Sequence, residues 1–105
     1  MVIPGFGIDV TQTDATAVVR VVGELDLATA PHLRKELAGL TNSGVRDVTV
    51  DLAHLDFIDS TGLYVLVSGL KRLRELVGDL ALQSPKPSAM KLFEMTGLTA
   101  VFAIS

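Results

Sequence analysis

Apolar positions along this chain recur at two spacings, and each spacing predicts one kind of element. Residues 16–22 are apolar apart from Arg20, which predicts a strand covered on both faces of a sheet. In residues 48–52 apolar and polar side chains alternate, which predicts a second strand that continues through residues 57–58. Further strand or edge segments are expected at residues 80–83 and 100–104.

Between these strands the apolar spacing changes to three and four residues, which is typical of helices with one buried face. The first helix begins near Pro31, a good first-turn residue, and is closed by Gly44. The second and most regular helix runs from Ser60 to about Val77. The third is opened by Pro85 and Pro87 and runs through about Thr96. Alternating strands and helices imply parallel pairing through right-handed crossovers.

The length and composition are those of one globular unit, so we expect a single α/β domain over residues 1–105. A net charge of −3 with nine dispersed Lys and Arg residues argues against nucleic acid and against an anionic membrane as partners. There is no cysteine for disulfide, thiolate or redox chemistry. No apolar run approaches the roughly 18 residues of a membrane-spanning helix, so no membrane insertion and a cytoplasmic location are expected.

Residues 56–63 read Asp-Phe-Ile-Asp-Ser-Thr-Gly-Leu and lead from an apolar strand into the second helix. Ser60 therefore lies at a predicted helix N-terminus, where a phosphate would be well placed. A simpler explanation is that Ser60 only caps the helix. Two features favour a function: Asp56 and Asp59 bring carboxylates near the hydroxyl, and Gly62 leaves space for another protein to approach the backbone.

Catalytic readings of this loop are weak. The Gly-x-Ser-x-Gly elbow of serine hydrolases is absent because Ile58 occupies the first glycine position. The two histidines, His32 and His54, are expected on the surface rather than as oriented bases. Both phosphate-loop fingerprints are also missing, so no nucleotide cofactor is expected and the chain is predicted not to be an enzyme.

Three other groups of residues have the chemistry of possible sites. Asp51, Asp56 and Asp59 could gather around Mg²⁺, but two spaced carboxylates per ion are a weak signal. Asp51 alternates outward from a strand and Asp59 can cap a helix, so no metal site is predicted. Asp26 follows Gly-Glu-Leu and is expected to close its own loop through its side chain. A last set, expected in or near the core, consists of Met90, Phe93 and Met95.

The Asp-Ser-Thr-Gly-Leu stretch at residues 59–63 resembles the signature of anti-sigma factor antagonists, the single-domain members of the bacterial STAS group. Two further blocks fit the same family in the same order. Residues 23–26 with Thr29 and Leu33 look like its first conserved loop and helix, and residues 87–102 look like its closing helix and turn. One departure is Tyr64, where such proteins often have glycine or another small residue.

The resemblance implies a STAS-like fold with a mixed, mostly parallel sheet and crossover helices. It implies that the unphosphorylated protein binds an anti-sigma factor, itself a serine kinase, and so frees a sigma factor by partner switching. Phosphorylation of Ser60 would end that binding, and a serine phosphatase would restore it. The partner-binding residues implied by the motif and its neighbouring loop are Asp26, Asp59, Ser60, Thr61, Gly62 and Leu63.

A second reading keeps the fold without the sigma-factor circuit. The chain would then be a STAS interaction subunit of a lipid-transport or stressosome-like assembly, and Ser60 would serve only as a cap. The sequence alone leaves both readings open.

Overall fold

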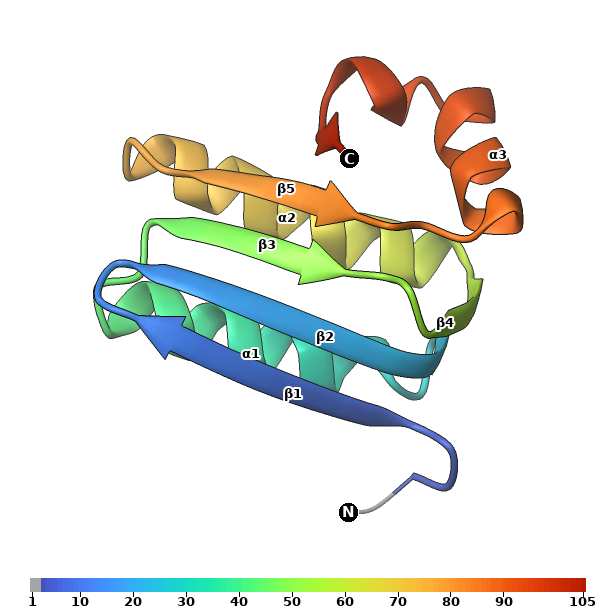
Figure 1. Ribbon diagram of the computed structural model, residues 1–105, viewed down its shortest axis with the longest axis horizontal. Coiled ribbons are helices and arrows are strands. Elements are labelled where there is room, and N and C mark those ends of the chain that lie inside the picture. The colour runs from blue at the N-terminus through green and yellow to red at the C-terminus, as the bar shows by residue number, and fades with distance from the viewer. Residues whose placement is uncertain (1–2) are drawn as a thin grey trace.

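The computed structural model describes residues 3–105, and within them it contains one six-stranded sheet, three α-helices and a short 3-10 helix (Figure 1). The strands are β1 (Gly7–Thr13), β2 (Thr16–Leu25), β3 (Asp47–Asp51), β4 (Leu55–Ile58), β5 (Asp79–Gln83) and β6 (Ala103–Ile104). The helices are α1 (Ala30–Asn42), α2 (Ser60–Glu75) and α3 (Pro87–Met95), followed by the 3-10 helix η1 (Leu98–Ala100).

The strand order is β1-β2-β3-β5-β6, and β4 pairs with β2 beyond the end of β3. The β1–β2 pair is antiparallel and every other pair is parallel. The expected α/β fold with a mixed, mostly parallel sheet is therefore confirmed.

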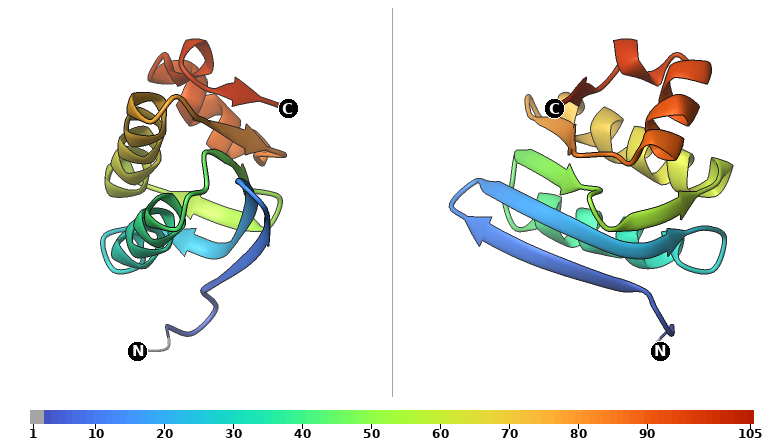
Figure 2. Two further views of the ribbon diagram at one scale, coloured as in Figure 1. Left: turned by 90° about the vertical axis from the view of Figure 1, so that its left-hand side faces the viewer. Right: turned by 45° about the vertical axis from the view of Figure 1, so that its right-hand side comes forward.

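Both long helices, α1 and α2, lie on the same face of the sheet (Figure 2). The crossovers β2–α1–β3 and β4–α2–β5 advance across the sheet in one direction, so their common right-handedness places both helices on one side. In β2 this buries Val19 and Val21, while Val18 on the other face is 40% exposed and Arg20 is exposed. The prediction that this strand is covered on both faces is wrong for that reason.

Three strands differ from the sequence-based prediction. The segment expected at residues 100–104 is a strand only at Ala103–Ile104, because the chain is still in η1 and the turn after it until residue 102. β1 was not predicted, because it is an edge strand whose residues are mostly exposed and therefore carry little apolar pattern. Residues 57–58 do not continue β3. The chain turns at Leu52, whose carbonyl accepts a hydrogen bond from the Leu55 N–H at 3.1 Å, and then forms β4, which pairs with β2 instead. β2 itself runs through Gly23 to Leu25.

The helix boundaries shift by a few residues. α2 ends at Glu75 rather than Val77, and Val77 has a left-handed backbone with a φ of 63°. α3 begins at Pro87, and Gly97 follows it with a φ of 75°, as expected of a residue that closes a helix.

Apolar side chains from the helix-covered face of the sheet pack with α1 and α2 to form the core. α3 lies at one edge, near β4 and η1, and buries only one of its faces. Of its three expected core residues, Phe93 is fully buried and Met90 half-buried, but Met95 is 74% exposed. The core assignment of Met95 is wrong because this residue lies in the last turn of α3, on a face that neither β4 nor η1 covers.

Candidate functional site

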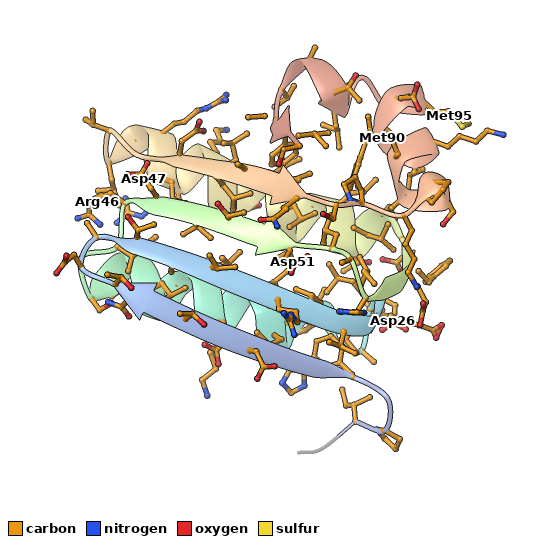
Figure 3. All side chains as sticks on the ribbon, viewed as in Figure 1. Asp26, Arg46, Asp47, Asp51, Met90 and Met95 are labelled. Atoms are coloured by element: carbon orange, nitrogen blue, oxygen red, sulfur yellow. The ribbon has the colours of Figure 1, made fainter. Side chains whose placement is uncertain are left out.

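The candidate site lies at the end of the sheet where β2 and β4 finish. Parallel strands bring their carboxyl ends to one edge, so the loop after β2 and the junction between β4 and α2 meet there. Asp26 marks this end in Figure 3. The backbone N–H of Asp59 donates to the Leu25 carbonyl at 3.1 Å, which ties the two segments together.

Ser60 is the first residue of α2, and it is exposed. The cap is Asp59, whose Oδ1 accepts a hydrogen bond from the Gly62 N–H at 3.0 Å. The alternative in which Ser60 is retained as the cap is therefore wrong, whereas the expected capping role of Asp59 is confirmed. The Ser60 hydroxyl is left available for chemistry with another molecule.

Two backbone N–H groups in the first turn of α2 are not used within residues 3–105 of the protein. Asp59 and Gly62 use their N–H groups within the protein, as described above. In the part of the chain that the structure describes, the N–H groups of Ser60 and Thr61 have no protein acceptor. Two such donors and the positive end of the helix dipole favour a negative charge at the start of α2.

Asp26 organises the loop between β2 and α1. Its Oδ1 accepts hydrogen bonds from the backbone N–H groups of Ala28 at 3.0 Å and Thr29 at 3.1 Å. The Thr29 hydroxyl is buried, donates to the Glu24 carbonyl at 2.7 Å and accepts from the Asp26 N–H at 2.8 Å. The expected loop-closing role is thus confirmed, and Asp26 remains half-buried at the surface of the site.

Gly62 has a different role from the one expected. It is buried, and a Cβ placed on it would lie 2.8 Å from Ile58 Cγ1 and 2.9 Å from both Cγ and the carbonyl oxygen of Leu25. The missing side chain therefore lets α2 pack closely against β2 and β4. The interpretation that it opens the backbone to another protein is wrong, because the space it leaves faces the interior.

The remaining motif residues are only partly accessible. Thr61 is half-buried, and so is Leu63, which packs against the core. The structure thus brings the six predicted partner-binding residues to one end of the sheet, but Ser60 is the one that is fully at the surface.

Carboxylates surround the site without forming a metal centre. Glu24, Asp26 and Asp56 line a hollow of about 310 Å³ beside the segment that leads into β1. Asp56 also forms an ion pair with Lys86, which precedes α3. Across residues 3–105, no group of three His, Asp or Glu side chains is arranged to hold a metal ion. Asp51 instead pairs with Arg20 at 3.6 Å on the uncovered face of the sheet.

The two histidines were expected at the surface. His54 is exposed in the turn between β3 and β4, as expected. His32 is half-buried on α1, with its ring 6.0 Å from that of Phe6. In residues 3–105 no helix has the length and apolar character needed to cross a membrane.

Sequence reasoning did not include the exposed apolar residues of this end among the site residues. Leu27 is 76% exposed, Tyr64 69% and Phe57 51%. One signal for Tyr64 was available, because it falls outside the helical stripe formed by Leu66 and Leu70. Phe57 offered none, since an apolar residue in a strand is expected to be buried.

The chain is similar to several known proteins. The family model described as STAS domain matches residues 7–105. The anti-sigma-B factor antagonist of Bacillus subtilis (strain 168) is 35% identical over 98 residues, which cover 93% of this chain and 89% of that protein. An anti-sigma factor antagonist from Mycobacterium paratuberculosis has a similar structure, with a TM-score of 0.85, 26% identity, and coverage of 99% of this chain and 89% of the other.

The anti-sigma factor antagonist SpoIIAA is also similar and has been solved in two states. Its unphosphorylated form has a TM-score of 0.82 at 25% identity, over 95% of this chain and 87% of that one. The phosphorylated form, from Bacillus, has a TM-score of 0.75 at 25% identity, over 95% and 90%. With the family match over nearly all the described residues and an antagonist relative above 30% identity, this chain belongs to the STAS domain family.

Proposed function

We propose that this chain is an anti-sigma factor antagonist controlled by phosphorylation of Ser60. Unphosphorylated, it binds an anti-sigma factor that is also a serine kinase, and so releases a sigma factor. Phosphorylation of Ser60 ends the complex, and a serine phosphatase restores it. The contact surface is centred on Ser60 and includes Asp26, Asp59, Thr61 and Leu63.

The observation that carries this proposal is an exposed serine at the first position of α2 whose capping role is taken by Asp59. A kinase can modify the hydroxyl without breaking the cap. Phosphorylation therefore leaves the fold in place, and the added charge meets the two available N–H groups of the first helical turn. The solved phosphorylated form of SpoIIAA supports a modification of this kind in a related protein.

The same charge is unfavourable in a complex. A phosphate adds roughly −1.5 to −2 charge at neutral pH, next to Asp56 and Asp59 and to whatever the partner places over Ser60. A penalty of about 1–3 kcal/mol, the usual scale of coupling between sites, weakens binding about 5- to 150-fold. Binding thus responds to phosphorylation far more than folding does.

Two variants of Ser60 test the proposal. Each anti-sigma factor kinase of the source organism is purified and mixed with the chain, with and without ATP, and affinity is measured by calorimetry. We expect phosphate on wild type but none on Ser60→Ala. Ser60→Asp should bind at least about fivefold more weakly than wild type while melting within about 1 kcal/mol of it.

Thr13→Asp is the matched control, since it adds the same charge to an exposed residue at the opposite end of the sheet. It should bind as wild type does. Phosphate retained in Ser60→Ala, or full affinity in Ser60→Asp, would contradict the proposal. Wild type that binds no anti-sigma factor favours the reading as an interaction subunit of another assembly.

A further inference from the structure

Large apolar side chains are exposed around Ser60, and they come from three segments of the chain. Leu27 belongs to the loop after β2, Phe57 to β4, and Tyr64 to the second turn of α2. Single exposed apolar residues are ordinary, but several at one place mark an interaction surface. We call these three residues the apolar rim.

The backbone places the rim residues close to the hydroxyl. Tyr64 is four residues after Ser60, so their Cβ atoms lie about 5–6 Å apart on one face of the helix. Helical side chains lean toward the N-terminus, which carries the Tyr64 ring toward the first turn. The other two residues lie near the paired ends of β2 and β4, where Leu25 is opposite Ile58.

The surface continues beyond the rim. A groove of about 370 Å³ runs between β4 and α3, and Phe57 lines it together with Leu92 and Met95. Met95 is 74% exposed there, on α3 in Figure 3. The carboxylates of Glu24 and Asp26 border the side of this surface next to the loop after β2. On the side of the groove, Asp56 is paired with Lys86, and Lys91 also lines the groove. A partner that covers it needs an apolar recess with basic groups at its edge.

Tyr64 is the rim residue best suited to anchor a partner. Its side chain has only two rotatable angles to order, a large ring to bury, and a hydroxyl that can stay at the wet edge of an interface. Tyrosine is also enriched among the few residues that dominate binding energy in protein interfaces. Its 69% exposure leaves most of that ring uncovered in the free protein.

We propose that Tyr64 is the specificity-determining anchor of this chain: together with Leu27 and Phe57, its ring fills an apolar recess, bordered by basic groups, on the anti-sigma factor. The inference rests on the proposed function, because the occupant of the surface is the same partner. It adds that recognition depends on side chains outside the phosphorylation motif. Anti-sigma factors without a matching recess are then rejected.

The test compares affinities of unphosphorylated variants for each purified anti-sigma factor kinase of the source organism, by calorimetry. Tyr64→Ala should weaken the best complex at least about tenfold. Tyr64→Phe should stay close to wild type, because the ring and not the hydroxyl fills the recess. Phe57→Ala and Leu27→Ala should weaken the complex by smaller factors. Tyr64→Ala should also reduce the affinity difference between the best partner and the next.

Val77→Ala is the matched control. Val77 is 95% exposed just beyond the other end of α2, so its removal should leave affinity unchanged. Thermal melts identify any variant with a damaged fold, and Tyr64→Gln replaces Tyr64→Ala if the latter is damaged. Tyr64→Ala that binds as tightly as wild type, or more tightly, overturns the inference.

Further outcomes separate the two proposals. If phosphorylation of Ser60 abolishes binding while Tyr64→Ala has no effect, the switch stands and the anchor is wrong. If Tyr64→Ala abolishes binding while Ser60→Asp has no effect, the anchor stands and the switch is wrong. If wild type binds none of the kinases, both fail.

Discussion

The two ends of the sheet have opposite characters. At the end that holds Ser60, apolar side chains and a hydroxyl are left exposed. The loops there are held by the Asp59 N–H bond to Leu25 and by local bonds such as that from the Gly62 N–H to Asp59. At the opposite end, where β3 and β5 begin, the backbone groups of the connecting segments form hydrogen bonds with one another. Arg46 lies there, next to Asp47 in Figure 3.

Arg46 connects four segments at that opposite end. Its N–H donates to the Ala15 carbonyl at 2.8 Å, and its carbonyl accepts from the Asp79 N–H at 2.9 Å. Its guanidinium Nη1 donates to the Thr41 carbonyl at 3.1 Å and to the Val45 carbonyl at 2.9 Å. Such bonding satisfies loop backbone that a partner could otherwise use. One end therefore maintains the fold, which leaves the other end available for binding.

The comparison predicts that the largest stability loss comes from the opposite end, far from the site. A Cβ on Gly78 would lie 2.0 Å from the Arg46 carbonyl oxygen and 2.8 Å from its carbon. Both are backbone atoms in a bonded junction, so they cannot yield. We expect Gly78→Ala to lose more than about 3 kcal/mol of unfolding free energy, or to fail to fold.

Gly39→Ala is the matched control, and the unfolding free energies of both variants are measured in denaturant. Gly39 lies inside α1 with nothing within 4 Å of its added Cβ. Alanine there should stabilise the protein by up to about 1 kcal/mol. A Gly78→Ala protein as stable as wild type would show that the junction is not the rigid part of the fold.

The next effect is expected within the binding end itself. Gly62→Ala forces a methyl group against Leu25 and Ile58, and we expect a loss of about 1–3 kcal/mol, less than at Gly78 because two of the three close atoms belong to side chains. Helix propensity alone predicts the opposite sign. The unfolding free energy of Gly62→Ala, measured in denaturant, decides between these two expectations. A neutral or stabilised variant would refute the packing role of Gly62.

Removal of the α2 cap should have a smaller effect. Asp59→Ala takes away the acceptor of the Gly62 N–H, which costs about 1 kcal/mol, within the 0.5–2 kcal/mol range of cap losses. Asp59→Ser keeps a capping oxygen and should recover most of that stability. Thermal melts of the two variants check this; an equal loss in both would mean that the cap is not what stabilises the turn.

The smallest effect is a gain at the opposite end. Val77 is a β-branched residue with a φ of 63° and is 95% exposed, so its backbone is strained and its side chain buries almost nothing. Val77→Gly should raise stability by about 0.5–1 kcal/mol, since glycine is the preferred residue at this helix-closing position. A thermal melt in which Val77→Gly is less stable than wild type would contradict the strain at Val77. The affinity of this variant for the anti-sigma factor should equal that of wild type.

Local pattern was enough to determine much of this protein. The apolar stripe of α2, the strand alternation at residues 48–52 and the glycine that closes α3 each depend on neighbours only a few residues away, so the sequence predicted them. It also identified Asp26 and Asp59 as residues that satisfy nearby backbone, because an aspartate reaches donors two or three residues ahead.

Tertiary structure decided what depends on distant partners. β1 forms because β2 is beside it, and β4 leaves β3 because β2 extends past it. The packing role of Gly62 becomes visible only in the folded structure, where Leu25 lies against α2. The exposure of Phe57 and Met95 could not be predicted either. An apolar residue is buried only where another element of the fold covers it, and none of the described elements covers these two side chains.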